Sequence, residues 1–254
     1  MALDIITLVV AGAGASWGWW QLQRRRNARL GLKELESAFE DDAKVVLTVA
    51  GHAMTSRNHP EMWPLHLLYG LLQDEAFTGA IGKLDGDADL AETQVLAALD
   101  ERTVEPAGAP QVLAVLNHCY GVSQQFDRKV SVAELAVYML ATDAAAFIAV
   151  DNYELRFLLA HGMKMPLADL PGRTDVAIVI RNDHHSTFEF VMGILENVFD
   201  LSAADAKARA METHTQGRAV IGQFKIAVAR DKVSAARSRA REQGHPFWIA
   251  LEDC

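Results

Sequence analysis

Cysteine and proline are both scarce in this sequence. Its two cysteines, Cys119 and Cys254, are too few for a scaffold held by disulfides, and such low usage is typical of a reducing compartment. Seven prolines in 254 residues, with 50% hydrophobic and 22% charged residues, exclude extensive disorder. Positive charge is in deficit, with 24 Lys and Arg against 33 Asp and Glu. Phosphate contacts need clustered Lys and Arg, so no nucleic acid is expected as a partner.

Motifs for nucleotide, metal and catalytic chemistry are also missing. The sequence contains no GxxxxGK(S/T) phosphate loop, which excludes ATP hydrolysis by that route. It contains neither HExxH nor the paired-cysteine spacing of zinc sites, so no metal is expected. No nucleophile–base pair or cofactor loop is recognisable. We therefore expect a protein that is not an enzyme and needs no cofactor.

One long uncharged run lies at the N-terminus. Residues 5–23 carry no charge, and as a helix they would span about 28 Å, close to the ~30 Å of bilayer hydrocarbon. Tryptophans gather at the end of this run and three arginines follow it, the pattern of a headgroup anchor with a cytoplasmic stop. A cleaved signal peptide would carry its positive charge before the run. We expect residues 1–27 to cross the inner (cytoplasmic) membrane once, with the later domains in the cytoplasm. An interfacial helix is the alternative.

Residues 28–163 show helical apolar periodicity and an internal repeat. The pattern VLxVxxH at 46–52 recurs at 112–118, and the apolar segment 67–72 lines up with 135–140. These features predict a duplicated all-α bundle. The repeat places His52 and His118 at matching positions, which duplication explains more simply than a paired metal or catalytic site.

The last part of the chain has a different pattern. The Pro- and Gly-containing stretch 164–173 is typical of a linker, and the β-branched run 176–180 predicts a buried strand. Ser186 and Ser202 each begin a helix-capping pattern, and Gly217 is placed to end the second helix. A strand at 218–226, a helix at 227–243 and a strand at 247–251 follow. The order β-α-α-β-α-β predicts a small two-layer α/β domain over 174–254. The whole chain is thus predicted to be α plus α/β, with an N-terminal transmembrane helix.

Three motifs, RNDHHSTFEFVMGILENVF, ETHTQGRAVIG and GHPFWIALE, occur in that order in this last domain. With the β-α-α-β-α-β order they resemble the ClpS adaptor family. The resemblance implies recognition of N-terminal degrons, meaning a free α-amino group followed by an apolar first side chain, and delivery of such substrates to a Clp-type AAA+ unfoldase and its protease. The repeat at 28–163, with PLHLLYGLL at 64–72, resembles the Clp N-terminal (R) domain, which serves docking in those unfoldases.

The resemblance to ClpS also implies which residues bind substrate. Asn182, Asp183 and His214 occupy the positions that hold the α-amino group, and their oxygen and nitrogen acceptors suit an ammonium ion. The positions of the side-chain pocket are occupied by Ser186, Phe188, Val191, Ala210, Thr213 and Phe247. Each residue also has a structural explanation, because Asn and Asp form turns and a His at a helix end complements the helix dipole.

Several of these residues depart from the family pattern. His184 stands where the family usually has a second Asp, Ala210 replaces a large apolar residue, and Phe188 replaces Met. These differences predict an altered preference for the first residue of the substrate. The sequence therefore favours a membrane-tethered N-degron adaptor. The alternative is a scaffold or inhibitor that binds a Clp unfoldase through both domains and leaves the amino-group pocket unused.

Overall fold

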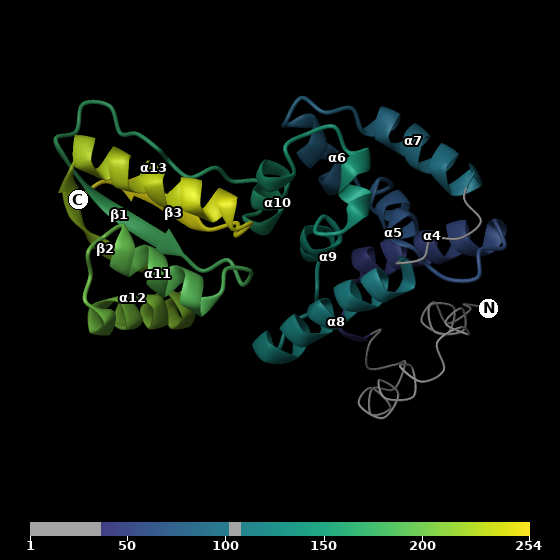
Figure 1. The fold of residues 1–254 in the computed structure, drawn as a ribbon, viewed down its shortest axis with the longest axis horizontal. Helices are drawn as coiled ribbons and strands as arrows, with labels where there is room; N and C mark the ends of the chain where they lie inside the picture. The colour runs from purple at the N-terminus through teal and green to yellow at the C-terminus, as the bar shows by residue number, and fades with distance from the viewer. Residues whose placement is uncertain (1–36, 102–107) are drawn as a thin grey trace. The chain divides into compact units, whose positions relative to one another are not determined.

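The computed structural model describes residues 37–101 and 108–254 (Figure 1). The chain divides into two compact units at the peptide bond between Leu159 and Ala160. The first unit is helical and the second is built on a sheet. Each unit has its own core and is described by itself.

The described part of the first unit contains seven α-helices and one 3-10 helix. They are α4 (Asp41–Ser56), α5 (Pro64–Leu71), α6 (Glu75–Gly82), α7 (Ala88–Glu101), α8 (Gly108–Phe126), α9 (Val132–Met139), η1 (Asp143–Phe147) and α10 (Asn152–Ala160). The repeated pattern VLxVxxH falls on α4 and α8, and the apolar segments aligned with each other fall on α5 and α9. His52 and His118 are both exposed, and the described residues contain no cluster suited to hold a metal ion.

Helix α5 is the centre of this unit. Seven of its eight residues are buried, and it contacts α4, α7, α8, α9 and η1. A helix that is apolar on every side belongs in a core. Gly70 lets α4 approach α5 closely, because a Cβ atom at this position would lie 2.4 Å from the carbonyl oxygen of Val46.

A buried histidine also lies in α5. His66 is completely buried, and its Nδ1 accepts a hydrogen bond from the backbone N–H of Trp63 at 2.9 Å. The proton of the neutral ring is therefore on Nε2, which lies 2.9 Å from Nδ1 of His59 and donates to it. Burial, followed by the charges of His59 and Arg57, lowers the pKa of His66 to about 3. The folded protein thus keeps this ring neutral at every pH near neutrality.

The helical unit is expected to lose stability as the pH falls below 6.5. The unfolded chain then protonates His66 while the folded chain does not, which shifts the equilibrium toward unfolding. This one group accounts for about 2 kcal/mol at pH 5. His66→Gln retains a capping acceptor but does not titrate. Denaturant unfolding followed by circular dichroism should therefore show that the free energy of unfolding falls less between pH 8 and pH 5 in the variant than in the unaltered protein. Equal decreases in the two proteins would show that His66 does not cause the pH dependence.

The second unit is a three-stranded sheet with helices packed on it. Its elements are β1 (Asp175–Arg181), α11 (Phe188–Asn197), α12 (Ala203–Gln216), β2 (Arg218–Lys225), α13 (Ile226–Glu242) and β3 (Trp248–Glu252). This is the β-α-α-β-α-β order expected from the sequence. The strands lie in the order β2-β1-β3 and both pairings are antiparallel. Alternate residues of β1, Val176, Ile178 and Ile180, are fully buried in the core shared with the helices.

Local capping places the two helices that follow β1. The side chain of Thr187 accepts a hydrogen bond from the backbone N–H of Phe190, so α11 begins one residue after the predicted Ser186 cap. Ser202 caps α12 as predicted, by accepting from the N–H of Asp205. Gly217 ends α12 with a φ of 80°, a left-handed conformation that glycine adopts without steric cost.

The predicted transmembrane helix is not upheld. In the part of the chain that the structure describes, no helix combines the length and apolarity needed to cross a membrane. The longest described helix, α8, has 19 residues but carries polar side chains such as Asn117 and Gln124. The predicted span itself, residues 5–23, lies outside the described residues. We correct the fold class to a helical unit followed by an α/β unit, and we withdraw the inner-membrane location and the membrane partner.

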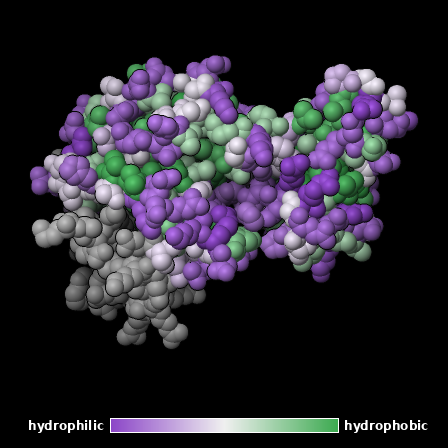
Figure 2. Space-filling view, turned by 180° about the vertical axis from the view of Figure 1, so that it is seen from behind, coloured by the Kyte–Doolittle hydropathy of each residue, from purple (hydrophilic) through white to green (hydrophobic). Residues whose placement is uncertain are grey.

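The described surface carries a small number of exposed large apolar side chains. Figure 2 shows hydrophilic residues across the face in view, with hydrophobic residues between them. The large hydrophobic side chains that are exposed are Val45, Leu90, Met165, Leu167, Phe188, Met211 and Val228. Of these, Phe188 belongs to the pocket described next.

Candidate functional site

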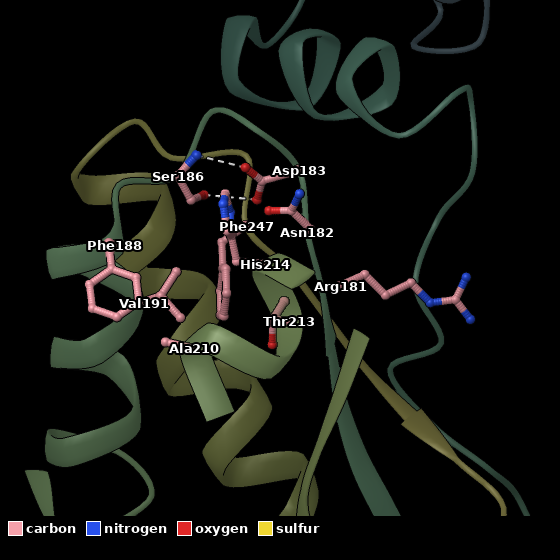
Figure 3. Close-up of a pocket in the computed structure, with 10 residues that line it drawn as sticks. All are labelled: Arg181, Asn182, Asp183, Ser186, Phe188, Val191, Ala210, Thr213, His214 and Phe247. Atoms are coloured by element: carbon pink, nitrogen blue, oxygen red, sulfur yellow. Dashed lines mark hydrogen bonds between the residues drawn. The ribbon is translucent and has the colours of Figure 1, made fainter. Parts of the chain in front are cut away.

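A pocket opens in the second unit where β1 ends, between α11 and α12 (Figure 3). It is lined by Arg181, Asn182, Asp183, Ser186, Phe188, Val191, Ala210, Thr213, His214 and Phe247. All nine site residues predicted from the sequence are therefore brought together around one cavity. The cavity volume is about 60 Å³, where a single water needs only ~10–15 Å³. There is thus room for a small group of atoms.

Asp183 organises the turn that follows β1. Its side chain is only 6% exposed, and its Oδ1 accepts hydrogen bonds from the backbone N–H groups of His185, at 2.8 Å, and Ser186, at 2.6 Å. Its Oδ2 accepts from the Ser186 hydroxyl at 2.8 Å. A carboxylate has about four acceptor positions, so one acceptor position on Oδ2 remains. His184, between these residues, has a left-handed φ of 58°.

Asn182 connects this turn to the end of α12. Its backbone N–H donates to the carbonyl oxygen of Gly217 at 3.0 Å, which holds the last turn of α12 beside the turn of Asp183. Its side-chain Nδ2 donates to Nδ1 of His184 over 2.9 Å. The side-chain oxygen of Asn182 points toward the other pocket residues in Figure 3.

Helix α12 contributes three neighbouring residues. Ala210 and Thr213 are 3% and 5% exposed, and both line the inner side of the pocket. The Thr213 hydroxyl donates to the carbonyl oxygen of Arg209 at 2.8 Å, so its proton is used within the helix. His214 is exposed on the last turn of α12, where a protonated ring would complement the helix dipole.

The remaining wall is apolar. Phe247, 1% exposed, packs edge-on against Phe190 with ring centroids 5.5 Å apart. Val191 is half-buried, and Phe188 is 37% exposed on the first turn of α11, at the rim. Apolar groups therefore lie beside the polar groups of Asn182, Asp183 and His214. A pocket of this kind suits a ligand whose cationic group is next to an apolar group.

Arg181 lines the same pocket but was not among the predicted site residues. It is the last residue of β1, opposite Arg218 on β2 and Trp248 on β3. In Figure 3 its side chain points away from the other nine. Its guanidinium pairs with Glu252 at 3.1 Å and lies 5.5 Å from the ring centroid of Trp248. Only its place directly before Asn182 could have indicated it from the sequence.

Comparisons with known proteins identify the second unit. The family model described as "ATP-dependent Clp protease adaptor protein ClpS" matches residues 173–250. The ATP-dependent Clp protease adapter protein ClpS of Wolinella succinogenes is 34% identical over 77 residues, covering 30% of this chain and 76% of that protein. The ClpS of Desulforapulum autotrophicum is 37% identical over 75 residues, covering 30% and 72%. The chain belongs to the ClpS adaptor family.

The ClpS match accounts for the second unit only. A solved structure, that of Agrobacterium tumefaciens ClpS2 bound to L-phenylalaninamide, covers 31% of this chain and 95% of that chain, with 26% identity and a TM-score of 0.30. The family consists of adaptors rather than enzymes, in agreement with the expectation from the sequence. The matched residues begin at 173, so the resemblance of residues 28–163 to the Clp R domain stays a prediction.

Proposed function

We propose that the ClpS unit binds the N-terminal residue of substrate proteins and delivers them to a Clp-type AAA+ unfoldase. The observation that carries this proposal is the convergence of nine separately positioned residues on one pocket, polar on one side and apolar on the other. The ClpS relatives support the adaptor role. The helical unit, residues 28–163 in the sequence prediction, would then serve as a docking domain.

The polar side would hold the α-ammonium group. An ammonium ion has three N–H donors and needs an acceptor for each. Asp183 offers the unused position on Oδ2 together with its negative charge, and Asn182 offers its side-chain oxygen. A neutral His214 ring has one unprotonated nitrogen, which is an acceptor. Charge-assisted hydrogen bonds of this type are roughly twice as strong as neutral ones. An acetylated N-terminus carries no charge and presents one donor, so it would not fit.

The apolar side would hold the first side chain of the substrate. Ala210 leaves space on α12, while the rings of Phe188 and Phe247 narrow the pocket from two other sides. The position of Phe188 at the rim places a planar ring where the ligand enters. The first-residue preference would therefore be set by fit between these two rings.

The proposal is tested with the full-length protein and short fluorescent peptides that differ only in the first residue. Phe, Leu, Trp, Val and Met would each be offered with a free and with an acetylated N-terminus. Saturable binding of the free peptides alone, measured by fluorescence anisotropy, is the expected result. Equal binding of both forms, or none, would reject the degron role. Recovery of an unfoldase unaffected by Asn182→Ala would then favour the scaffold or inhibitor alternative.

A further inference from the structure

The ClpS unit extends upstream of the residues that match the family. His161, twelve residues before the match begins at 173, has its Nε2 2.6 Å from the carbonyl oxygen of Pro246. A carbonyl oxygen only accepts, so Nε2 carries the proton and donates. The ring also contacts the ring of Trp248, with centroids 4.9 Å apart. A residue outside the family match thus bonds to the chain directly before the pocket residue Phe247.

The acceptor belongs to a tight turn that sets the position of Phe247. Helix α13 is closed by the N–H of His245, which donates to the carbonyl oxygen of Ala240 at 2.9 Å. The N–H of Phe247 then donates to the carbonyl oxygen of His245 at 2.7 Å, which makes a three-residue turn centred on Pro246. The carbonyl group of Pro246 is part of the peptide unit that leads into Phe247. A hydrogen bond from His161 to that carbonyl therefore restricts the orientation of the Phe247 backbone.

The backbone directly after His161 has an unusual conformation. Gly162 and Met163 have consecutive left-handed φ values of 59° and 66°. This conformation is costly for Met163 and persists only where surrounding contacts impose it. Further along, the carbonyl oxygen of Leu167 accepts from the N–H of Leu251 at 3.0 Å, at the edge of the sheet. The chain is thus bonded to the rest of the ClpS unit before this turn, through His161, and after it, through Leu167 in the stretch 164–173 that the sequence predicts to be a linker.

Burial lowers the pKa of His161, while its hydrogen bond to the Pro246 carbonyl and the charge of Asp183 oppose that shift. The group that the ring contacts directly is the Pro246 carbonyl, next to Phe247, which we assign to the first side chain of the substrate.

We propose that His161 is a positioning residue for the side-chain half of the pocket: by donating to the Pro246 carbonyl it fixes Phe247 against the first side chain of the substrate. This inference rests on the proposed N-terminal recognition. It makes the first-residue preference depend on a segment outside the family match.

Two variants distinguish the contribution of the His161 hydrogen bond from that of its aromatic ring. His161→Phe keeps an aromatic ring against Trp248 but removes the donor, whereas His161→Gln loses the ring and keeps an N–H donor at a similar reach. In full-length protein, His161→Phe is expected to weaken binding of a Leu-first peptide by about three- to tenfold, the effect of one hydrogen bond. Binding of a Gly-first peptide, which uses the ammonium site alone, should change less than twofold. His161→Gln should restore most of the loss.

Amide exchange measured without peptide gives an independent check. Exchange of the Phe247 N–H should be faster in His161→Phe than in His161→Gln or the unaltered protein, while the melting temperatures remain similar. Unchanged Leu-first binding by His161→Phe, or equal losses for both peptides, would overturn the positioning role. Absence of binding by the unaltered protein would instead overturn the proposed function and this inference with it.

Discussion

Replacing Asp183 by Asn is expected to weaken binding of free-amine peptides by about 10- to 100-fold while the ClpS unit stays folded. A hydrogen bond to a charged group contributes ~1.5–3 kcal/mol, and 1.4 kcal/mol corresponds to a factor of ten. The Asn side-chain oxygen still accepts from the backbone N–H groups of His185 and Ser186, so the turn keeps these two bonds. The variant loses the negative charge facing the ammonium and the acceptor at Oδ2, because the amide NH2 in its place only donates.

The comparison with Asp183→Ala separates binding from folding. Alanine removes the acceptor as well as the charge, and leaves two backbone N–H groups of a largely buried turn without their partner. This variant should lose ~1–3 kcal/mol of stability in addition to binding. Asp205→Asn is a matched control, because Asp205 is an exposed Asp that also bonds to a serine hydroxyl, in the same unit but away from the pocket. If Asp183→Asn bound as tightly as this control, the ammonium would not lie at Asp183.

Replacing Gly70 by Ala is expected to destabilise the helical unit by about 3 kcal/mol, the upper part of the usual range for an overpacked core. The added methyl carbon would lie 2.4 Å from the carbonyl oxygen of Val46 and 3.2 Å from its Cγ1. The first of these atoms is backbone, so α4 or α5 must shift to relieve the clash. Because α5 contacts four other helices and η1, such a shift disturbs the whole core.

Gly79→Ala is the matched control for this prediction. Gly79 lies within α6, and a Cβ atom there would meet nothing within 4 Å. The same substitution at Gly79 should stabilise the unit by up to about 1 kcal/mol, because alanine is the better helix former. Denaturant unfolding followed by circular dichroism compares the two variants. Similar effects of both substitutions would show that the close approach of α4 and α5 is not a constraint.

The ClpS unit could be predicted closely because its signals are local. The β-branched run of β1, the Ser202 cap and the left-handed Gly217 are each set by a few adjacent residues. Helix α11 begins one residue later than predicted, because two neighbouring hydroxyls, Ser186 and Thr187, can each cap it. Ser186 bonds instead to Asp183, a choice that the spacing of capping residues does not reveal.

The prediction of a transmembrane helix at the N-terminus was wrong, and it rested on the pattern of apolar and charged residues alone. An uncharged run and its flanking charges indicate where a helix would be long enough to cross a membrane, but they do not establish that it does. Among the described residues, the apolar helix α5 is buried against its neighbours. Apolar content alone does not distinguish a lipid environment from a protein core.

The sequence by itself determined the order of the elements in the ClpS unit and the kinds of chemistry its site residues bring. Tertiary structure alone decided that β1, α11, α12 and the residue before β3 place those side chains around one cavity. It alone decided that His161 bonds to Pro246, 85 positions along the chain, and that Gly70 meets Val46. The physical reason is the distance along the chain between the interacting residues. Helix caps and strand-forming runs depend on sequence neighbours, whereas these contacts depend on how whole elements pack.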